Sequence, residues 1–242
     1  MPLDPLTARS QAPERMDDLT IGGRELAEAL AQLAWINRLL GAPWITLEGV
    51  RRLWRAAGCP RRLSLVDVGA GGGESNRLLL RWAALSRVDL GITLIDIHPE
   101  TCAYAARIYA DEPRVRVEQG DLFDLPAGHA DLVTASLLLH HLPNESLPRA
   151  LRAMRQAARI GLVVNDLHRH PAAEWLIRQA TRLLSRNEMI RHDAPLSVRR
   201  GFRAAELRLL REEPGLESLH FAWRPFFRYL LILPGEGSPC GT

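Results

Sequence analysis

The sequence lacks lysine altogether, so all 31 of its basic residues are arginine. Catalysis through a lysine Schiff base or a lysine general base is therefore excluded. Cysteine is also scarce, because only Cys59, Cys102 and Cys240 occur and no two of them form a Cys-x-x-Cys pair. Three scattered cysteines suggest neither a disulfide framework nor a zinc site.

Long apolar runs are missing as well. No run approaches the roughly 20 residues that cross a bilayer, and Met1–Ser10 lacks the basic and apolar regions of a signal peptide. We therefore expect a cytoplasmic protein with no membrane partner. The formal net charge is only +3, and the arginines alternate with acidic residues, which argues against nucleic acid as a partner. A length of 242 residues with 47% hydrophobic content is typical of one elaborated domain.

The most informative segment covers residues 65–74 and reads Leu-Val-Asp-Val-Gly-Ala-Gly-Gly-Gly-Glu. It predicts a buried strand that runs through a glycine turn into a helix over Ser75–Trp82. Glycines at such a turn let a ligand lie directly against the backbone at the carboxyl end of the strand. A dinucleotide site would need a third glycine at position 74, where the sequence has Glu74. This carboxylate would repel a pyrophosphate, so NAD and FAD are disfavoured.

Three further apolar runs, at positions 92–95, 115–118 and 131–136, end in polar residues at plausible spacing for βα units. The first is followed by Asp96, the second by Gln-Gly-Asp-Leu at 119–122, and the third by Leu-His-His-Leu at 139–142. Together with Asp-x-Gly-x-Gly-x-Gly at 67–73, they resemble motifs I to IV of the class I S-adenosylmethionine-dependent methyltransferases, in the right order. The resemblance covers about residues 63–166.

This resemblance implies that S-adenosylmethionine is the cofactor. In the family the acid of motif II accepts both ribose hydroxyls, and the acid of motif III binds the adenine amino group. The residues that we expect to bind the cofactor are Asp67, Gly69, Ala70, Gly71, Asp96, Ile97, Asp121, Leu122 and Ser136.

The predicted fold is α/β, with a doubly wound, seven-stranded, mostly parallel Rossmann-like sheet. Strands near 216–223 and 227–233 would close it as a C-terminal antiparallel hairpin, as the family implies. We expect an N-terminal helical cap over residues 1–60 and a core over 61–242. This core would carry a lid insertion at about 168–200, made of a helix over 172–184 and a polar segment over 185–200. The tail, 234–242, is rich in Gly and Pro and is expected to be disordered.

Transfer of a methyl group to a phenol or an enol requires a base, and histidine titrates near neutrality. Our catalytic candidates are His140, His141 and Asp166, with His168 and His192 as further options. The Leu-His-His-Leu segment resembles the ubiquinone and menaquinone biosynthesis methyltransferases. We expect His140 to be the more open of the pair and His141 to pack between leucines. Asp166 would orient a histidine or the substrate hydroxyl.

No metal is expected from the sequence. Catechol-type methyltransferases carry an Asp-Asn pair that chelates magnesium, whereas the order here is reversed to Asn165-Asp166. The matching positions after the fourth strand are Ser136 and Leu137, which leaves the oxygen-rich coordination incomplete.

The acceptor that we expect is a small hydrophobic or aromatic molecule, methylated on a phenolic or enolic oxygen. The Asn/Asp-Pro-Pro-Tyr/Phe motif of many amino methyltransferases is missing after the fourth strand, and so is the cysteine of pyrimidine C5 enzymes. Three alternatives stay open: carbon methylation of a quinone or polyketide precursor, methylation of RNA or protein, and a methyltransferase-like binding module without catalysis. A homodimer also stays open.

Overall fold

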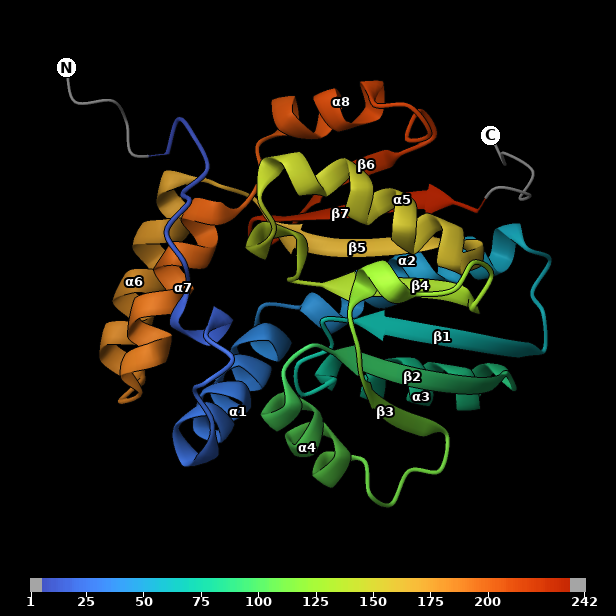
Figure 1. The fold of residues 1–242 in the computed structure, drawn as a ribbon, viewed down its shortest axis with the longest axis horizontal. Coiled ribbons are helices and arrows are strands. Elements are labelled where there is room, and N and C mark those ends of the chain that lie inside the picture. Colours follow the sequence, from blue (N-terminus) through green and yellow to red (C-terminus); the bar gives the residue numbers. More distant parts are fainter. Residues whose placement is uncertain (1–5, 236–242) are drawn as a thin grey trace.

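The computed structural model describes residues 6–235. A seven-stranded sheet forms its centre, in the order β3-β2-β1-β4-β5-β7-β6 (Figure 1). All neighbouring strands are parallel except around β7, which runs antiparallel to both β5 and β6. This arrangement confirms the predicted Rossmann-like α/β fold. The strands are β1 (Arg62–Val68), β2 (Asp89–Asp96), β3 (Val115–Gln119), β4 (Ala130–Ser136), β5 (Ala158–Leu167), β6 (His220–Arg224) and β7 (Arg228–Pro234).

Helices cover both faces of the sheet because its strands are apolar on both sides. Residues of α2, α3 and α4 share one buried cluster with β1 and β2, whereas residues of α5 and α8 share another with β4, β5 and β7. The bounds are α2 (Ala42–Ala56), α3 (Glu74–Ser86), α4 (Pro99–Ile108), α5 (Leu147–Ala157) and α8 (Ala204–Glu212).

A second group of helices lies beyond the carboxyl ends of the parallel strands (Figure 1). It consists of α1 (Gly23–Leu39), α6 (Pro171–Leu184) and α7 (Glu188–Arg200). Leu26, Ala29 and Leu30 of α1 pack against Met189 and Ile190 of α7 in a separate buried cluster. The chain before α1, which includes the short helix η1 (Arg15–Asp17), runs beside α7. Of the N-terminal sixty residues, α1 and its preceding segment therefore lie over this edge, while α2 packs on the sheet.

Three boundaries differ from the sequence-based expectations. Most of the polar segment 185–200 forms α7, whose start is capped by the Asn187 side chain accepting from Ile190 N at 3.1 Å. Its composition was misleading because Asp193 and Arg200 are buried in polar contacts. The first closing strand begins at His220 rather than near residue 216. Pro234 ends β7, so the tail predicted as disordered starts in a strand, and residues 236–242 lie outside the described part.

The sheet reverses its strand order between β1 and β4, which is where a doubly wound fold opens a crevice at the carboxyl edge. The loops after β1 to β5 all meet there. Three short 3-10 helices belong to this edge or follow it, namely η2 (Leu122–Asp124), η3 (Leu139–His141) and η4 (Asn144–Ser146). Within residues 6–235, no helix is both long enough and apolar enough to cross a membrane.

Candidate active site

The glycine turn after β1 adopts a conformation that side chains rarely tolerate. Gly69, Gly71 and Gly73 have φ angles of +60°, +56° and +73°. A Cβ on Gly69 would lie 2.5 Å from Leu138 Cδ1, so this glycine is needed for packing. A Cβ on Gly71 would meet only Leu30 Cδ2, at 3.9 Å, so the backbone there borders open space. Gly71 therefore gives a ligand direct access to the main chain.

Two acids hold this turn in place. Asp96, at the end of β2, accepts from Gly71 N through Oδ2 at 2.9 Å and from His98 N through Oδ1 at 3.0 Å. Asp67 lies beneath the turn, where it accepts from Thr134 Oγ1 at 2.7 Å and from Asn76 Nδ2 at 2.6 Å. Burial raises the pKa of Asp67 to about 6, although both hydrogen bonds oppose this shift. Asp67 thus orders the turn from below and does not line the main cavity, whereas Asp96 does.

A cavity of about 690 Å³ opens at this edge of the sheet. Burial raises the pKa of Glu74, on the cavity wall, to about 7. Asp121 caps η2 by accepting from Phe123 N at 2.9 Å and also lines the cavity. The cavity therefore brings together eight of the nine residues predicted to bind the cofactor: Gly69, Ala70, Gly71, Asp96, Ile97, Asp121, Leu122 and Ser136.

Much of the cavity wall is apolar. Four of its large apolar side chains are about half exposed, with 48% for Leu19, 51% for Ile97 and Leu176, and 55% for Phe226. Such exposure favours an apolar ligand. Arg228 adds a buried cation to this wall. Its Nη2 donates to Asn37 Oδ1 at 3.0 Å, but within residues 6–235 its Nε and Nη1 have no hydrogen-bond partner.

His140 lies on η3 after β4 and is held by the end of β5. Its Nδ1 lies 2.7 Å from Asp166 Oδ1, and its main-chain N donates to Asp166 Oδ2 at 3.2 Å. The expected pairing of Asp166 with a histidine is therefore present. Burial acts to raise the pKa of Asp166, but the charge of His140 and its hydrogen bond outweigh this effect and lower it.

His141 lies beside His140 and pairs with the segment before α1. Its Nδ1 is 2.5 Å from Asp17 Oδ1. Burial acts to lower the pKa of His141, but the hydrogen bond with Asp17 and the charge of Glu14 reverse the shift and raise it. Burial acts to raise the pKa of Asp17, but the hydrogen bond with His141 and the charge of His141 lower it to about 2.

The relative exposure of the two histidines is opposite to the sequence-based expectation. The side chain of His140 is 2% exposed and that of His141 is 24% exposed. The reason is the 3-10 conformation of η3, in which successive side chains point about 120° apart, so flanking leucines do not fix which histidine is buried. Both histidines line the cavity.

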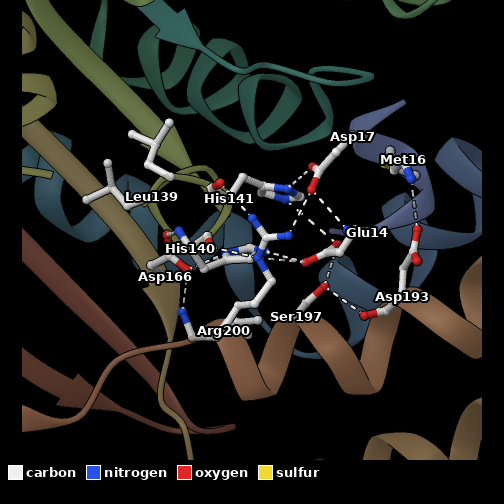
Figure 2. A network of polar contacts seen from close by, with 12 residues as sticks. Glu14, Met16, Asp17, Leu139, His140, His141, Asp166, Asp193, Ser197 and Arg200 are labelled. Carbon is white, nitrogen blue, oxygen red and sulfur yellow. Dashed lines mark hydrogen bonds and ion pairs between the residues drawn. The ribbon is translucent and has the colours of Figure 1, made fainter. Parts of the chain in front are cut away.

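A buried arginine joins this loop to the N-terminal segment (Figure 2). Arg200 donates to His140 O at 3.0 Å, to His141 O at 2.6 Å and to Asp17 Oδ2 at 2.8 Å. From the other side, Arg9 donates to His140 O at 2.9 Å and to Arg200 O at 2.7 Å. The two guanidinium groups therefore fix the histidine loop through its carbonyl groups.

The N-terminal partners were not found from the sequence. Glu14 accepts from Ser197 Oγ at 2.8 Å, and Asp193 accepts from the main-chain N of Arg15 and of Met16 at 2.9 and 3.0 Å. These contacts link residues far apart in the chain without any spacing motif. The only signal was the acidic character of the segment around residues 14–18 before the first helix.

The remaining candidates lie apart from this cluster. Asn165 Nδ2 donates to Ala42 O at 3.1 Å and to Ser136 Oγ at 3.3 Å, so Asn165 and Asp166 do not form a chelating pair. The rings of His168 and Tyr229 meet edge to face with centroids 5.1 Å apart, and His192 Nδ1 lies 2.7 Å from Asp193 Oδ1. Neither of these histidines lines the main cavity.

Comparison with known proteins supports a methyltransferase fold that binds S-adenosylmethionine. Residues 65–161 match the family described as a methyltransferase domain. No curated protein matches the sequence. The solved structure of an S-adenosylmethionine-dependent methyltransferase from Aquifex aeolicus is 14% identical, with a TM-score of 0.55 over 86% of this chain and 97% of that chain.

Two further similar structures carry more specific descriptions. Magnesium protoporphyrin IX methyltransferase from Synechocystis PCC 6803, with bound S-adenosylhomocysteine, is 15% identical, with a TM-score of 0.54 over 83% of this chain and 87% of that chain. The CMeT domain of the citrinin polyketide synthase is 13% identical, with a TM-score of 0.55 over 74% of this chain. This chain spans only 47% of that last structure. At these identities the likeness establishes the shared fold.

Proposed function

We propose that this chain, of which residues 65–161 match a methyltransferase domain, is a class I S-adenosylmethionine-dependent methyltransferase that methylates an oxygen atom of a small phenolic or enolic molecule. The observation that carries the proposal is a single cavity with the glycine turn and Asp96 on one side, apolar side chains on the other, and the histidine pair on its wall. Cofactor, acceptor and base would then meet in one cavity.

The residues at the glycine turn fit S-adenosylmethionine. The space over Gly71 suits a ligand that lies against the main chain. The carboxylate of Asp96 has lone pairs left beyond the two backbone N–H groups it accepts, so it can take ribose hydroxyls. Glu74, a partly buried side chain at the start of α3, opposes a pyrophosphate when its carboxyl group is ionised. When bound, the cofactor supplies a methyl group on a positively charged sulfur.

Residues of the cavity would hold both the cofactor and the acceptor. Ile97 and Leu122 would flank the cofactor, and Asp121 would accept a hydrogen bond from its adenine amino group. The half-exposed apolar side chains, such as Leu176 and Phe226, would hold an aromatic acceptor and exclude water. The buried guanidinium of Arg228 favours an acceptor that reacts as an anion, because its unpaired N–H groups stabilise negative charge.

We assign removal of the acceptor proton to the part of the cavity wall formed by His140 and His141. Since a carboxylate only accepts hydrogen bonds, Asp166 holds the proton of His140 on Nδ1 and leaves Nε2 as the basic atom. The acceptor oxygen would give up its proton at this wall and form a bond to the methyl carbon as the carbon–sulfur bond breaks. S-adenosylhomocysteine is then the second product.

The test is methyl transfer from isotope-labelled S-adenosylmethionine to a panel of naphthols, hydroxypyrones and alkylresorcinols, with each acceptor's methyl ether as the matched control. We expect one labelled methyl group on oxygen, located by mass fragmentation, and no reaction of a fully etherified control. His140→Gln should lower the rate constant by roughly 10²- to 10⁴-fold. A methyl group found only on carbon would replace this proposal with the carbon-methylation alternative.

A further inference from the structure

Three potential metal ligands converge on the cavity wall (Figure 2). Glu14 comes from the N-terminal segment, and His140 and His141 come from η3. One ligand atom from each lies within 4.8 Å of the other two. Glu14 Oε1 is 3.7 Å from His140 Nε2, and Glu14 Oε2 is 3.9 Å from His141 Nε2.

Each histidine is oriented by its own carboxylate on the opposite ring nitrogen. His140 Nδ1 faces Asp166 at 2.7 Å, and His141 Nδ1 faces Asp17 at 2.5 Å. Because both carboxylates accept, each neutral ring carries its proton on Nδ1 and presents the Nε2 lone pair toward Glu14. Metal-binding histidines in proteins are oriented in this way, by a carboxylate on the nitrogen that does not bind the metal.

Direct contacts among the three ligands do not satisfy them. Separations of 3.7 and 3.9 Å are too long for hydrogen bonds. Glu14 is 4% exposed, and its Oε1 has no hydrogen-bond partner within residues 6–235. Arg200 Nε lies 3.8 Å from this oxygen, which is too far for a hydrogen bond. A buried carboxylate oxygen without a donor is unfavourable, and a cation between these side chains would satisfy it.

The spacing suits an ion at the centre of the three ligands. With metal–ligand distances near 2.1 Å, tetrahedral ligand atoms lie about 3.4 Å apart. The two distances from Glu14 to the histidines, 3.7 and 3.9 Å, exceed this value by a few tenths of an ångström, and all three ligand atoms lie within 4.8 Å of one another. The charge balance also suits a cation, since the carboxylates of the network belong to Glu14, Asp17, Asp166 and Asp193. They outnumber the guanidinium groups around it, which belong to Arg9, Arg200 and Arg228.

We propose that Glu14, His140 and His141 bind a divalent transition-metal cation, with zinc as the first choice. Two imidazoles and one carboxylate favour zinc or a neighbouring transition metal over magnesium and calcium, which prefer all-oxygen sites. All three residues line the cavity, so a fourth position on the cavity side would be open to the acceptor. Three protein ligands with one open position are typical of catalytic rather than structural zinc.

The catalytic consequence rests on the proposed function. A phenolic hydroxyl at the open position would lose its proton to water more readily, because the cation stabilises the oxyanion. The histidines would then hold the ion instead of taking the proton directly. This site was not predicted from the sequence, because Glu14 is remote from the histidines in the chain and the metal sites considered there were a cysteine zinc site and an oxygen-rich magnesium site.

The test measures metal binding without any activity assay. The protein is stripped with a chelator, and Co²⁺ is titrated while the visible absorption is recorded, followed by competition with Zn²⁺. We expect one ion per chain with the absorption of cobalt in a four-coordinate site. Glu14→Gln and His141→Gln should each weaken binding at least tenfold, and Asp17→Asn, which keeps every ligand, by about 10- to 100-fold.

The matched control is His192→Gln. His192 also pairs with a carboxylate, at 2.7 Å from Asp193, but it is not one of the three converging ligands. Its loss should leave the affinity unchanged. The inference is overturned if wild type binds Co²⁺ no more tightly than Glu14→Gln, or if Asp17→Asn and His192→Gln weaken binding equally. Titration of the stripped protein with S-adenosylhomocysteine separates the two proposals, because cofactor binding without metal binding refutes only this one.

Discussion

Substitution of Gly71 by alanine tests whether the glycine turn exists to admit a ligand. Gly71 has a φ of +56° and faces open space, so Gly71→Ala adds backbone strain but no clash within the protein. The strain of a left-handed alanine is about 1 to 2 kcal/mol. We expect the free energy of unfolding, measured with urea, to fall by about that amount.

The effect on cofactor binding should be separate from this loss of stability. A methyl group that intrudes on a closely packed ligand costs about 1 to 3 kcal/mol, which corresponds to roughly 5- to 150-fold weaker binding. Calorimetric titration with S-adenosylhomocysteine measures it.

Gly58 provides a matched control, because it has a φ of +79°, has nothing within 4 Å of an added Cβ and lies after α2, away from the cavity. Gly58→Ala should therefore lose similar stability and keep wild-type affinity. Equal affinities of Gly71→Ala and Gly58→Ala would refute the role that we give to the turn.

Two further predictions concern buried charge near the cavity. Burial raises the pKa of Glu74 from 4.5 to about 7, so the folded state binds a proton that the unfolded state has lost, and stability should fall by up to about 3 kcal/mol as the pH rises from about 4.5 to 7. Glu74→Gln should flatten this part of the curve of unfolding free energy against pH, and an unchanged slope would contradict the assignment. Arg200→Met should cost about 3 kcal/mol and speed tryptic cleavage after Arg15, because it removes the guanidinium that donates to the carbonyl groups of His140 and His141 and to the carboxylate of Asp17. The control is Arg62→Met, which removes an exposed ion pair with Asp89 and should change neither the unfolding free energy nor the rate of cleavage.

The sheet was predictable because its signals are local. The apolar runs of β1 to β5 and the glycine turn each lie within about ten residues, and parallel strands bring their carboxyl ends to one edge. The positions of Asp96 and Asp121 on the cavity follow from that rule alone. The helix α7 was not predicted, because its polar residues are buried in contacts that composition does not reveal.

The histidine cluster shows the limit of local reasoning. The sequence placed His140 and Asp166 at the ends of neighbouring strands, so their contact could be anticipated. Glu14 and Asp17 reach the site because α1 packs against α7, which places the segment before α1 beside α7. Such a contact depends on tertiary packing, and nothing in the spacing of residues 14–17 specifies it.

The most direct test of the central claim is a calorimetric titration of the wild-type protein with S-adenosylhomocysteine, with NAD as the control ligand and Asp96→Ala as the comparison. We predict one saturable site for S-adenosylhomocysteine, no binding of NAD, and a loss of about 1 to 3 kcal/mol in the binding free energy of the variant, as expected when a buried polar contact is removed. Absence of binding by the wild type, or equal binding by wild type and Asp96→Ala, would contradict it.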